Sequence, residues 1–94
     1  MESDVKASCN RFLKKIPKSK FVPYSPYPYG EPGTPDKIGC INGQMILIEF
    51  KDKGKEPSAL QKIRIKEWQA AGAKVYVIDS LKKLKQEDLN VQRD

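Results

Sequence analysis

The chain has 94 residues, with 18 Lys and Arg against 12 Asp and Glu, a net charge of +6 and no histidine. That length allows a single domain over residues 1–94, and the positive charge favours a polyanionic partner. The lack of histidine excludes a His general base, a Ser-His-Asp triad, a His-containing zinc finger and a His-Asn-His nuclease centre. Hydrolytic chemistry would have to use carboxylates, lysine, tyrosine or a metal ion.

The two cysteines, Cys9 and Cys40, form no C-x-x-C pair and do not suggest a zinc site. We expect both to lie on apolar faces as free thiols, in a reduced, intracellular protein. No apolar run approaches the roughly 18 residues of a membrane span, and no signal peptide is recognisable, so a membrane partner is not expected.

The first predicted element is an amphipathic helix that Ser3 caps and that ends near Ile16. Its apolar residues recur at the spacing of one buried stripe: Val5, Cys9, Phe12, Leu13 and Ile16. The basic residues lie off this stripe and predict a solvated outer face: Lys6, Arg11, Lys14 and Lys15. Glu2 is in line with the stripe, so it either reaches a site near the core or favours the helix N-terminus electrostatically.

A short strand is predicted to start at Phe21 and Val22, before a segment with prolines at positions 23, 26, 28, 32 and 35. Those prolines exclude a helix and predict an extended or turning backbone. The segment also carries three tyrosines, Tyr24, Tyr27 and Tyr29. Two interpretations are open: the rings contact nucleic-acid bases or backbone, or they pack over the sheet as a rigid loop.

Residues 37–41 and 44–50 predict a β-hairpin around Asn42-Gly43, the sequence favoured in a two-residue type I′ turn. Facing residues then have numbers that sum to 85, which places Asp36 opposite Glu49 with Cα atoms about 4.5 Å apart. Facing carboxylates destabilise a sheet unless a cation lies between them. Lys51 projects from the same face as Glu49. The pattern predicts a metal site with a lysine beside it.

A second helix is predicted from the Ser58 cap to about Ala71, where Gly72 ends it. Its predicted buried face comprises Leu60, Ile63, Trp68 and Ala71. Gln61 has the spacing of a capping box with Ser58. The preceding polar connection carries Lys53 and Lys55 beside the proposed site, and Lys62 lies off the apolar face, available for phosphate.

The last predicted elements are a strand at 74–78 and a helix that Asp79-Ser80 caps. A strand, a crossover helix and a second strand favour a parallel, right-handed unit. The predicted order is therefore α-β-β-β-α-β-α, an α/β fold with a mixed sheet flanked by helices.

This ordered set of motifs resembles the virus-type replication-repair nuclease domain, VRR-NUC, of the PD-(D/E)XK nuclease superfamily. The resemblance runs through Gly33-Thr34-Pro35-Asp36 for G-x-P-D, Asn42-Gly43 in the hairpin, Glu49-Phe50-Lys51 for E-x-K, Gln61, and Ala71-Gly72-Ala73-Lys74-Val75. Glu2 would correspond to the acidic residue of the family's first helix.

The resemblance implies a restriction-endonuclease-like core that hydrolyses DNA with Mg²⁺ or Mn²⁺. Asp36, Glu49 and the backbone carbonyl of Phe50 would bind the metal, and Lys51 would stabilise charge on the phosphate or orient water. Gln61 would support Lys51, and Glu2 would give a further contact to a water ligand of the metal.

A standalone domain of this type is expected as a homodimer in a virus-infected bacterium, acting on branched DNA, especially four-way (Holliday) junctions. Three alternatives stay open: a monomeric flap or nicking nuclease, a non-catalytic basic DNA-binding module, and a small subunit that needs a larger partner.

Overall fold

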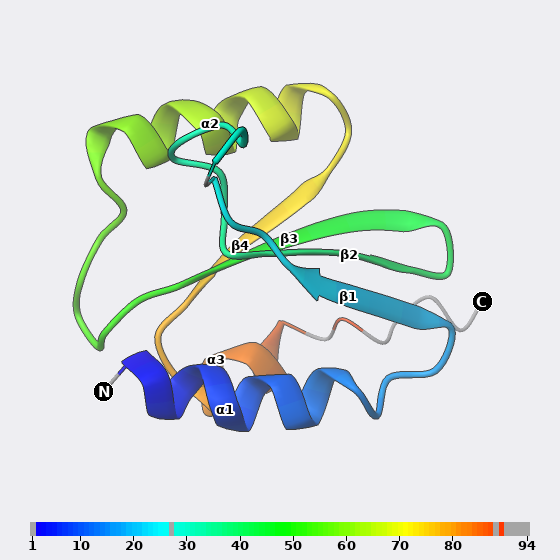
Figure 1. The fold of residues 1–94 in the computed structure, drawn as a ribbon. Coiled ribbons are helices and arrows are strands. Elements are labelled where there is room, and N and C mark those ends of the chain that lie inside the picture. Colours follow the sequence, from blue (N-terminus) through cyan, green and yellow to red (C-terminus); the bar gives the residue numbers. More distant parts are fainter. Residues whose placement is uncertain (1, 27, 88, 90–94) are drawn as a thin grey trace.

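In the computed structural model, which describes residues 2–26, 28–87 and 89, a four-stranded mixed sheet lies between helices (Figure 1). The elements in chain order are α1 (Glu2–Leu13), β1 (Ser19–Pro23), β2 (Lys37–Ile41), β3 (Gln44–Phe50), α2 (Ala59–Ala70), β4 (Lys74–Ile78) and α3 (Leu81–Gln86). The predicted α/β class and the order α-β-β-β-α-β-α are confirmed.

The sheet has the strand order β1-β2-β3-β4, antiparallel except for the parallel pair β3 and β4. The predicted hairpin register is confirmed, because the facing pairs run without a bulge from Ile41 and Gln44 to Lys37 and Ile48. Asn42 and Gly43 have φ angles of 48° and 89°, and the type I′ turn requires positive values at both positions. The turn therefore fixes which residues of β2 and β3 face each other.

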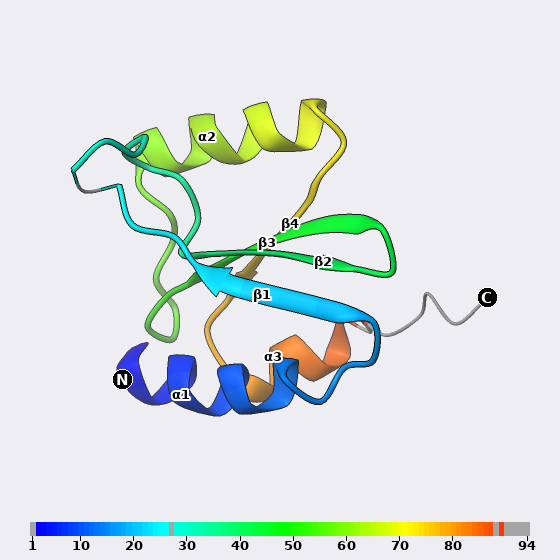
Figure 2. The same cartoon turned by 45° about the vertical axis from the view of Figure 1, so that its right-hand side comes forward.

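Two layers of helix cover the sheet: α1 and α3 on one face, α2 on the other (Figures 1 and 2). The main core lies between the sheet and the α1–α3 layer, and it includes Cys9, Leu13, Ile46, Ile48, Phe50, Ile78 and Leu84. The apolar stripe predicted for the first helix is thus buried. The helix begins at Glu2, so Ser3 lies inside it and not at its N-cap, and it gives way to turns after Leu13.

The predicted buried face of the second helix is wrong. Ser58 caps α2 and Gly72, with φ of 105°, follows its C-cap as expected, but no residue of this fully described helix is buried. Leu60 is 41% exposed and Ile63 is 52% exposed. The helix packs mainly over β4, and of the four predicted residues only Trp68 is half-buried, while Leu60, Ile63 and Ala71 stay exposed.

Both cysteines are free thiols beside apolar residues, as expected, but only Cys9 is buried. Cys40 is exposed on the outer side of β2, in a shallow apolar groove that Val22, Ile38 and Met45 also line. Among the described residues, no helix has the length and apolar character needed to cross a membrane.

Candidate active site

Asp36 lies where the proline-rich loop enters the sheet, immediately before β2. Its backbone carbonyl accepts a hydrogen bond from the Tyr24 amide at 2.8 Å, which continues the β1–β2 pairing. Its carboxylate Oδ2 accepts from the Phe50 amide at 2.9 Å, across the end of the hairpin. Asp36 is therefore held by its backbone at the end of β1 and by its side chain at the end of β3. Its partner on β3, Phe50, directly follows Glu49.

Glu49 is the buried acid of the central strand, with 2% of its surface exposed. Its Oε2 accepts a hydrogen bond from the Gln61 side-chain amide at 2.8 Å and lies 3.6 Å from Lys51 Nζ. A buried carboxylate is costly unless hydrogen bonds and opposite charge compensate for its lost hydration. The structure therefore brings Glu49, Lys51 and Gln61 together, as the hairpin pattern and the family resemblance led us to expect.

Gln61 forms the capping box predicted for it and, in addition, bonds to Glu49. Its side-chain oxygen accepts from the Ser58 amide at 2.8 Å, and the Ser58 hydroxyl accepts from the Gln61 amide at 3.2 Å, which completes a capping box. The side-chain NH₂ group remains free to donate to Glu49. The start of α2 is thereby tied to the acid on β3.

The loop between β1 and β2 folds on itself and packs against α2. The Tyr24 hydroxyl hydrogen-bonds to the backbone of Glu31, which favours the rigid-loop interpretation for this tyrosine. Tyr29 is 95% exposed and available to a partner, whereas Tyr27 lies outside the described residues. Glu2 begins α1, and its side chain also lies outside the described part of the chain.

Arg64 of α2 anchors this loop, a function that the sequence patterns did not indicate. Its Nε donates to the Pro32 carbonyl at 3.0 Å and lies 3.5 Å from a Glu31 carboxylate oxygen. Gly33, with φ of 85°, lets the loop approach the helix, because a Cβ there would lie 2.8 Å from the Leu60 side chain. The one sequence feature that hinted at this contact was Gly33 of the G-x-P-D motif, and a glycine does not identify the residue that it packs against.

The lysines predicted to contact DNA lie on the surface around the site. Lys53 and Lys55 are exposed in the connection before α2, which a hydrogen bond from the Gly54 amide to Asp79 holds at 3.4 Å. Lys62 pairs with Glu56 at 3.1 Å, and both side chains are more than half exposed. An exposed pair of this kind is worth about 0–1 kcal/mol, so a phosphate could displace Glu56.

The donor set fits a small, hard divalent cation. Asp36 offers a carboxylate bonded to the Phe50 amide, and Glu49, the preceding residue of β3, offers a second one. Within the described ranges no cluster of three or more His, Cys, Asp or Glu side chains is present. Mg²⁺ commonly uses one or two carboxylates and completes its shell with water and substrate phosphate. Two acids at the end of a strand are therefore sufficient when a phosphate takes part in binding.

Comparison of the chain with protein-family models and with curated proteins gave no significant match.

Proposed function

We propose that the chain is a divalent-metal-dependent nuclease that hydrolyses phosphodiester bonds in DNA. The observation that carries this proposal is the buried Glu49 carboxylate at the end of the central strand, held by Gln61 and Lys51. Apolar residues would fill that position at a lower desolvation cost, so the buried Glu49 is best explained by a functional role. Asp36, fixed on the Phe50 amide, supplies the second acid.

In this proposal Asp36, Glu49 and the Phe50 carbonyl hold Mg²⁺ or Mn²⁺. The ion, when bound, supplies Lewis-acid polarisation of the phosphate and lowers the pKa of water. Lys51 stabilises the negative charge that develops on the phosphate oxygens. Gln61 keeps Glu49 oriented through a hydrogen bond that is already present. Glu2, on the first turn of α1, is proposed as a further contact at this end of the sheet.

We further propose that the domain has a PD-(D/E)XK core of the VRR-NUC type. In support, G-x-P-D leads into β2, E-x-K ends β3, and the next helix starts with the glutamine that binds the E-x-K acid. The exposed Lys53, Lys55, Lys62 and Tyr29 are the candidate DNA contacts.

A four-way junction cut by a homodimer is the proposed substrate and assembly. The net charge of +6 suits DNA, and the apolar side chains that α2 leaves on the surface suit a second copy. Two sites related by two-fold symmetry match the paired strands of a junction. The free thiols are in keeping with a reducing, intracellular setting.

The test is digestion of labelled four-way, flap, nicked and linear DNA by purified protein with Mg²⁺, Mn²⁺ or EDTA. We expect cleavage only with metal, strongest on the four-way junction. Glu49→Gln and Asp36→Asn preserve side-chain size and should each lower the cleavage rate by roughly a hundredfold or more, while DNA binding persists.

Several outcomes would contradict the proposal or favour one of its alternatives. Undiminished cleavage by either variant, or cleavage in EDTA, would remove the carboxylates and the metal from the mechanism. Tight DNA binding by a wild-type protein that cuts none of the substrates would favour the non-catalytic module. Activity that emerges only after addition of a larger partner protein would favour the subunit alternative.

A further inference from the structure

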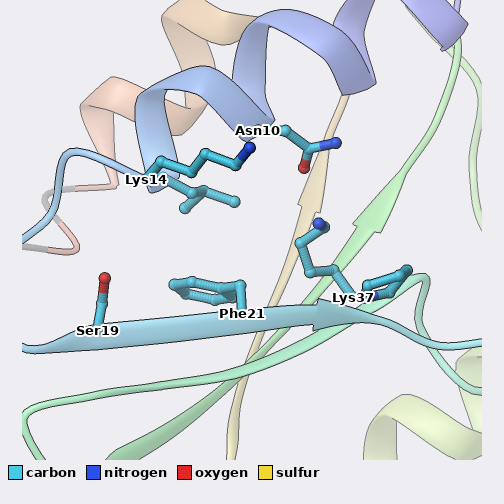
Figure 3. Close-up of a pocket in the computed structure, with 7 residues that line it drawn as sticks. Asn10, Lys14, Ser19, Phe21 and Lys37 are labelled. Carbon is cyan, nitrogen blue, oxygen red and sulfur yellow. The ribbon is translucent and has the colours of Figure 1, made fainter.

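A pocket of about 430 Å³ lies between α1 and the edge of the sheet formed by β1 and β2. Its lining residues are Asn10, Leu13, Lys14, Ser19, Phe21, Pro23 and Lys37. Figure 3 shows Asn10 of α1 and Lys14, in the turn after this helix, on one side of the pocket and Phe21 and Lys37 of the sheet on the other. Polar side chains from the helical layer and from β2 therefore meet over one apolar floor.

The pocket concentrates positive charge. Lys37 is the first residue of β2, and strand alternation turns it toward α1, away from the face that carries Glu49. Lys14 is exposed, as its place off the apolar stripe predicted, and it also lines this pocket. Neither lysine forms an ion pair with a carboxylate of the residues that the structure describes.

Lys14 and Lys6 are the positive charges that act on Lys37, so the three ammonium groups are close enough to interact. Three lysines so arranged repel each other in the free protein. An anion placed among them would remove that repulsion.

Asn10 adds a neutral polar group between the lysines. Its Oδ1 is buried and has no hydrogen-bond partner within the described part of the chain. A side-chain amide provides both a donor and an acceptor, so it can bind a phosphate oxygen and orient a lysine ammonium at the same time. Buried polar atoms are normally satisfied. A phosphate oxygen only accepts, so it would bond to the Asn10 NH₂ group, while a lysine ammonium drawn toward the phosphate would donate to Oδ1.

The pocket continues to Asp36, one of the two acids of the candidate active site. A smaller pocket of about 150 Å³ shares Asn10, Pro23 and Lys37 with it and is also lined by Lys6, Tyr24, Asp36 and Phe50. The two pockets form one path from the proposed metal ligand Asp36 to Lys14. We call this path the lysine groove, defined by Lys6, Asn10, Lys14 and Lys37.

We propose that the lysine groove binds a phosphate of the DNA strand next to the phosphate that is cut. This inference rests on the proposed function for its substrate. The apolar floor of Leu13, Phe21 and Pro23 would contact the sugar or base of that nucleotide, while Lys14, Lys37 and Asn10 contact the phosphate. The groove is a substrate-binding subsite and not part of the reacting centre.

The test measures binding of a fluorescein-labelled four-way junction and a labelled duplex in EDTA, so that cleavage plays no part. The variant is Lys14→Gln with Lys37→Gln. The matched control is Lys82→Gln with Lys83→Gln, which removes the same charge from exposed positions of α3. Circular dichroism verifies that both pairs are folded.

We expect the groove pair to lose affinity on the order of tenfold at moderate salt and to reduce the slope of log K against log salt by about two. The control pair should change affinity by about twofold or less. Lysine ε-CH₂ NMR signals of the wild-type protein should shift on DNA addition at positions 14 and 37, with little change at positions 82 and 83.

Equal losses for both pairs would assign the effect to net charge and overturn the proposal. So would saturable binding of inorganic phosphate at Lys14 and Lys37 combined with unchanged DNA affinity of the groove pair. Because EDTA suppresses cleavage, a wild-type protein that cuts nothing leaves this binding result interpretable. Conversely, if the wild-type protein cleaves DNA but the groove pair binds DNA as tightly as the wild type, this inference is wrong and the proposed function is unaffected.

Discussion

The Gln61 side chain donates to Glu49 Oε2 at 2.8 Å while its own oxygen accepts from the backbone amide at the cap of α2. One residue thus closes the helix start and holds the buried acid of the central strand. The position of α2 and the orientation of Glu49 are consequently coupled, and substitutions at the cap can separate the two roles.

Gln61→Ala should lower both stability and cleavage, whereas Ser58→Ala should lower stability alone. Each substitution breaks the capping box, which costs about 1 kcal/mol of the free energy of unfolding. Only Gln61→Ala also removes the donor to Glu49. Urea denaturation and the metal-dependent cleavage rate measure the two effects, and equal loss of cleavage in both variants would show that Gln61 acts only as a cap.

Gly39→Ala should destabilise the β1–β2 edge by about 1–3 kcal/mol. The Phe21 ring lies over Gly39, and an added Cβ would overlap that ring and come within 2.6 Å of the Lys20 carbonyl oxygen. Cys40→Ala is the matched control, since its side chain is exposed on the opposite face of the same strand. Urea denaturation should show little change for the control, and a Gly39→Ala protein of wild-type stability would contradict the overlap.

The two thiols should differ sharply in reactivity. Burial raises the pKa of Cys9 above its ordinary value of 9.0, partly offset by a hydrogen bond with Ser8, whereas Cys40 is exposed. A thiol reagent such as DTNB at pH 8 should label Cys40 quickly and Cys9 only after unfolding in urea. Rapid labelling of a native Cys40→Ala variant would show that Cys9 is accessible.

The same burial gives a pH dependence of stability. Above pH 9.0 the unfolded chain loses the Cys9 proton that the folded chain retains, so the free energy of unfolding should fall as pH rises. Replacing Cys9 with Ala should flatten this fall while lowering stability at neutral pH through lost packing. Urea titrations at several pH values between neutrality and pH 10 measure both effects, and an unchanged slope in the variant would exclude Cys9 as the source.

If α2 forms the dimer interface, Ile63→Glu should yield monomers. Ile63 is 52% exposed and Leu60 41% exposed on a helix without a buried residue, and a charge at position 63 would be desolvated in an interface. Gln69→Glu is the control, because it adds the same charge at an exposed position of the helix. Light scattering coupled to size exclusion gives the mass, and a wild-type monomer or a dimeric Ile63→Glu protein would refute this interface.

The sequence by itself determined the elements and the hairpin register. Asn42-Gly43 required a two-residue turn, and that turn alone set the facing pairs of β2 and β3 down to Lys37 and Ile48. Ser58 and Gly72 bounded α2 in the same local way. Such features depend on backbone conformation and on neighbours within a few residues, which a sequence displays directly.

The tertiary structure alone decided which side chains meet across elements. Arg64 anchors the proline-rich loop, Lys14 and Lys37 share a pocket, and Leu60 and Ile63 stay on the surface. The periodicity of α2 predicted an apolar face, but periodicity cannot say whether another layer exists to cover it. The spacing correctly predicted an exposed Lys14, but only the packing of α1 beside the sheet placed it on the same pocket as Lys37. Contacts of this kind depend on how layers are placed in space, and no local pattern specifies that placement.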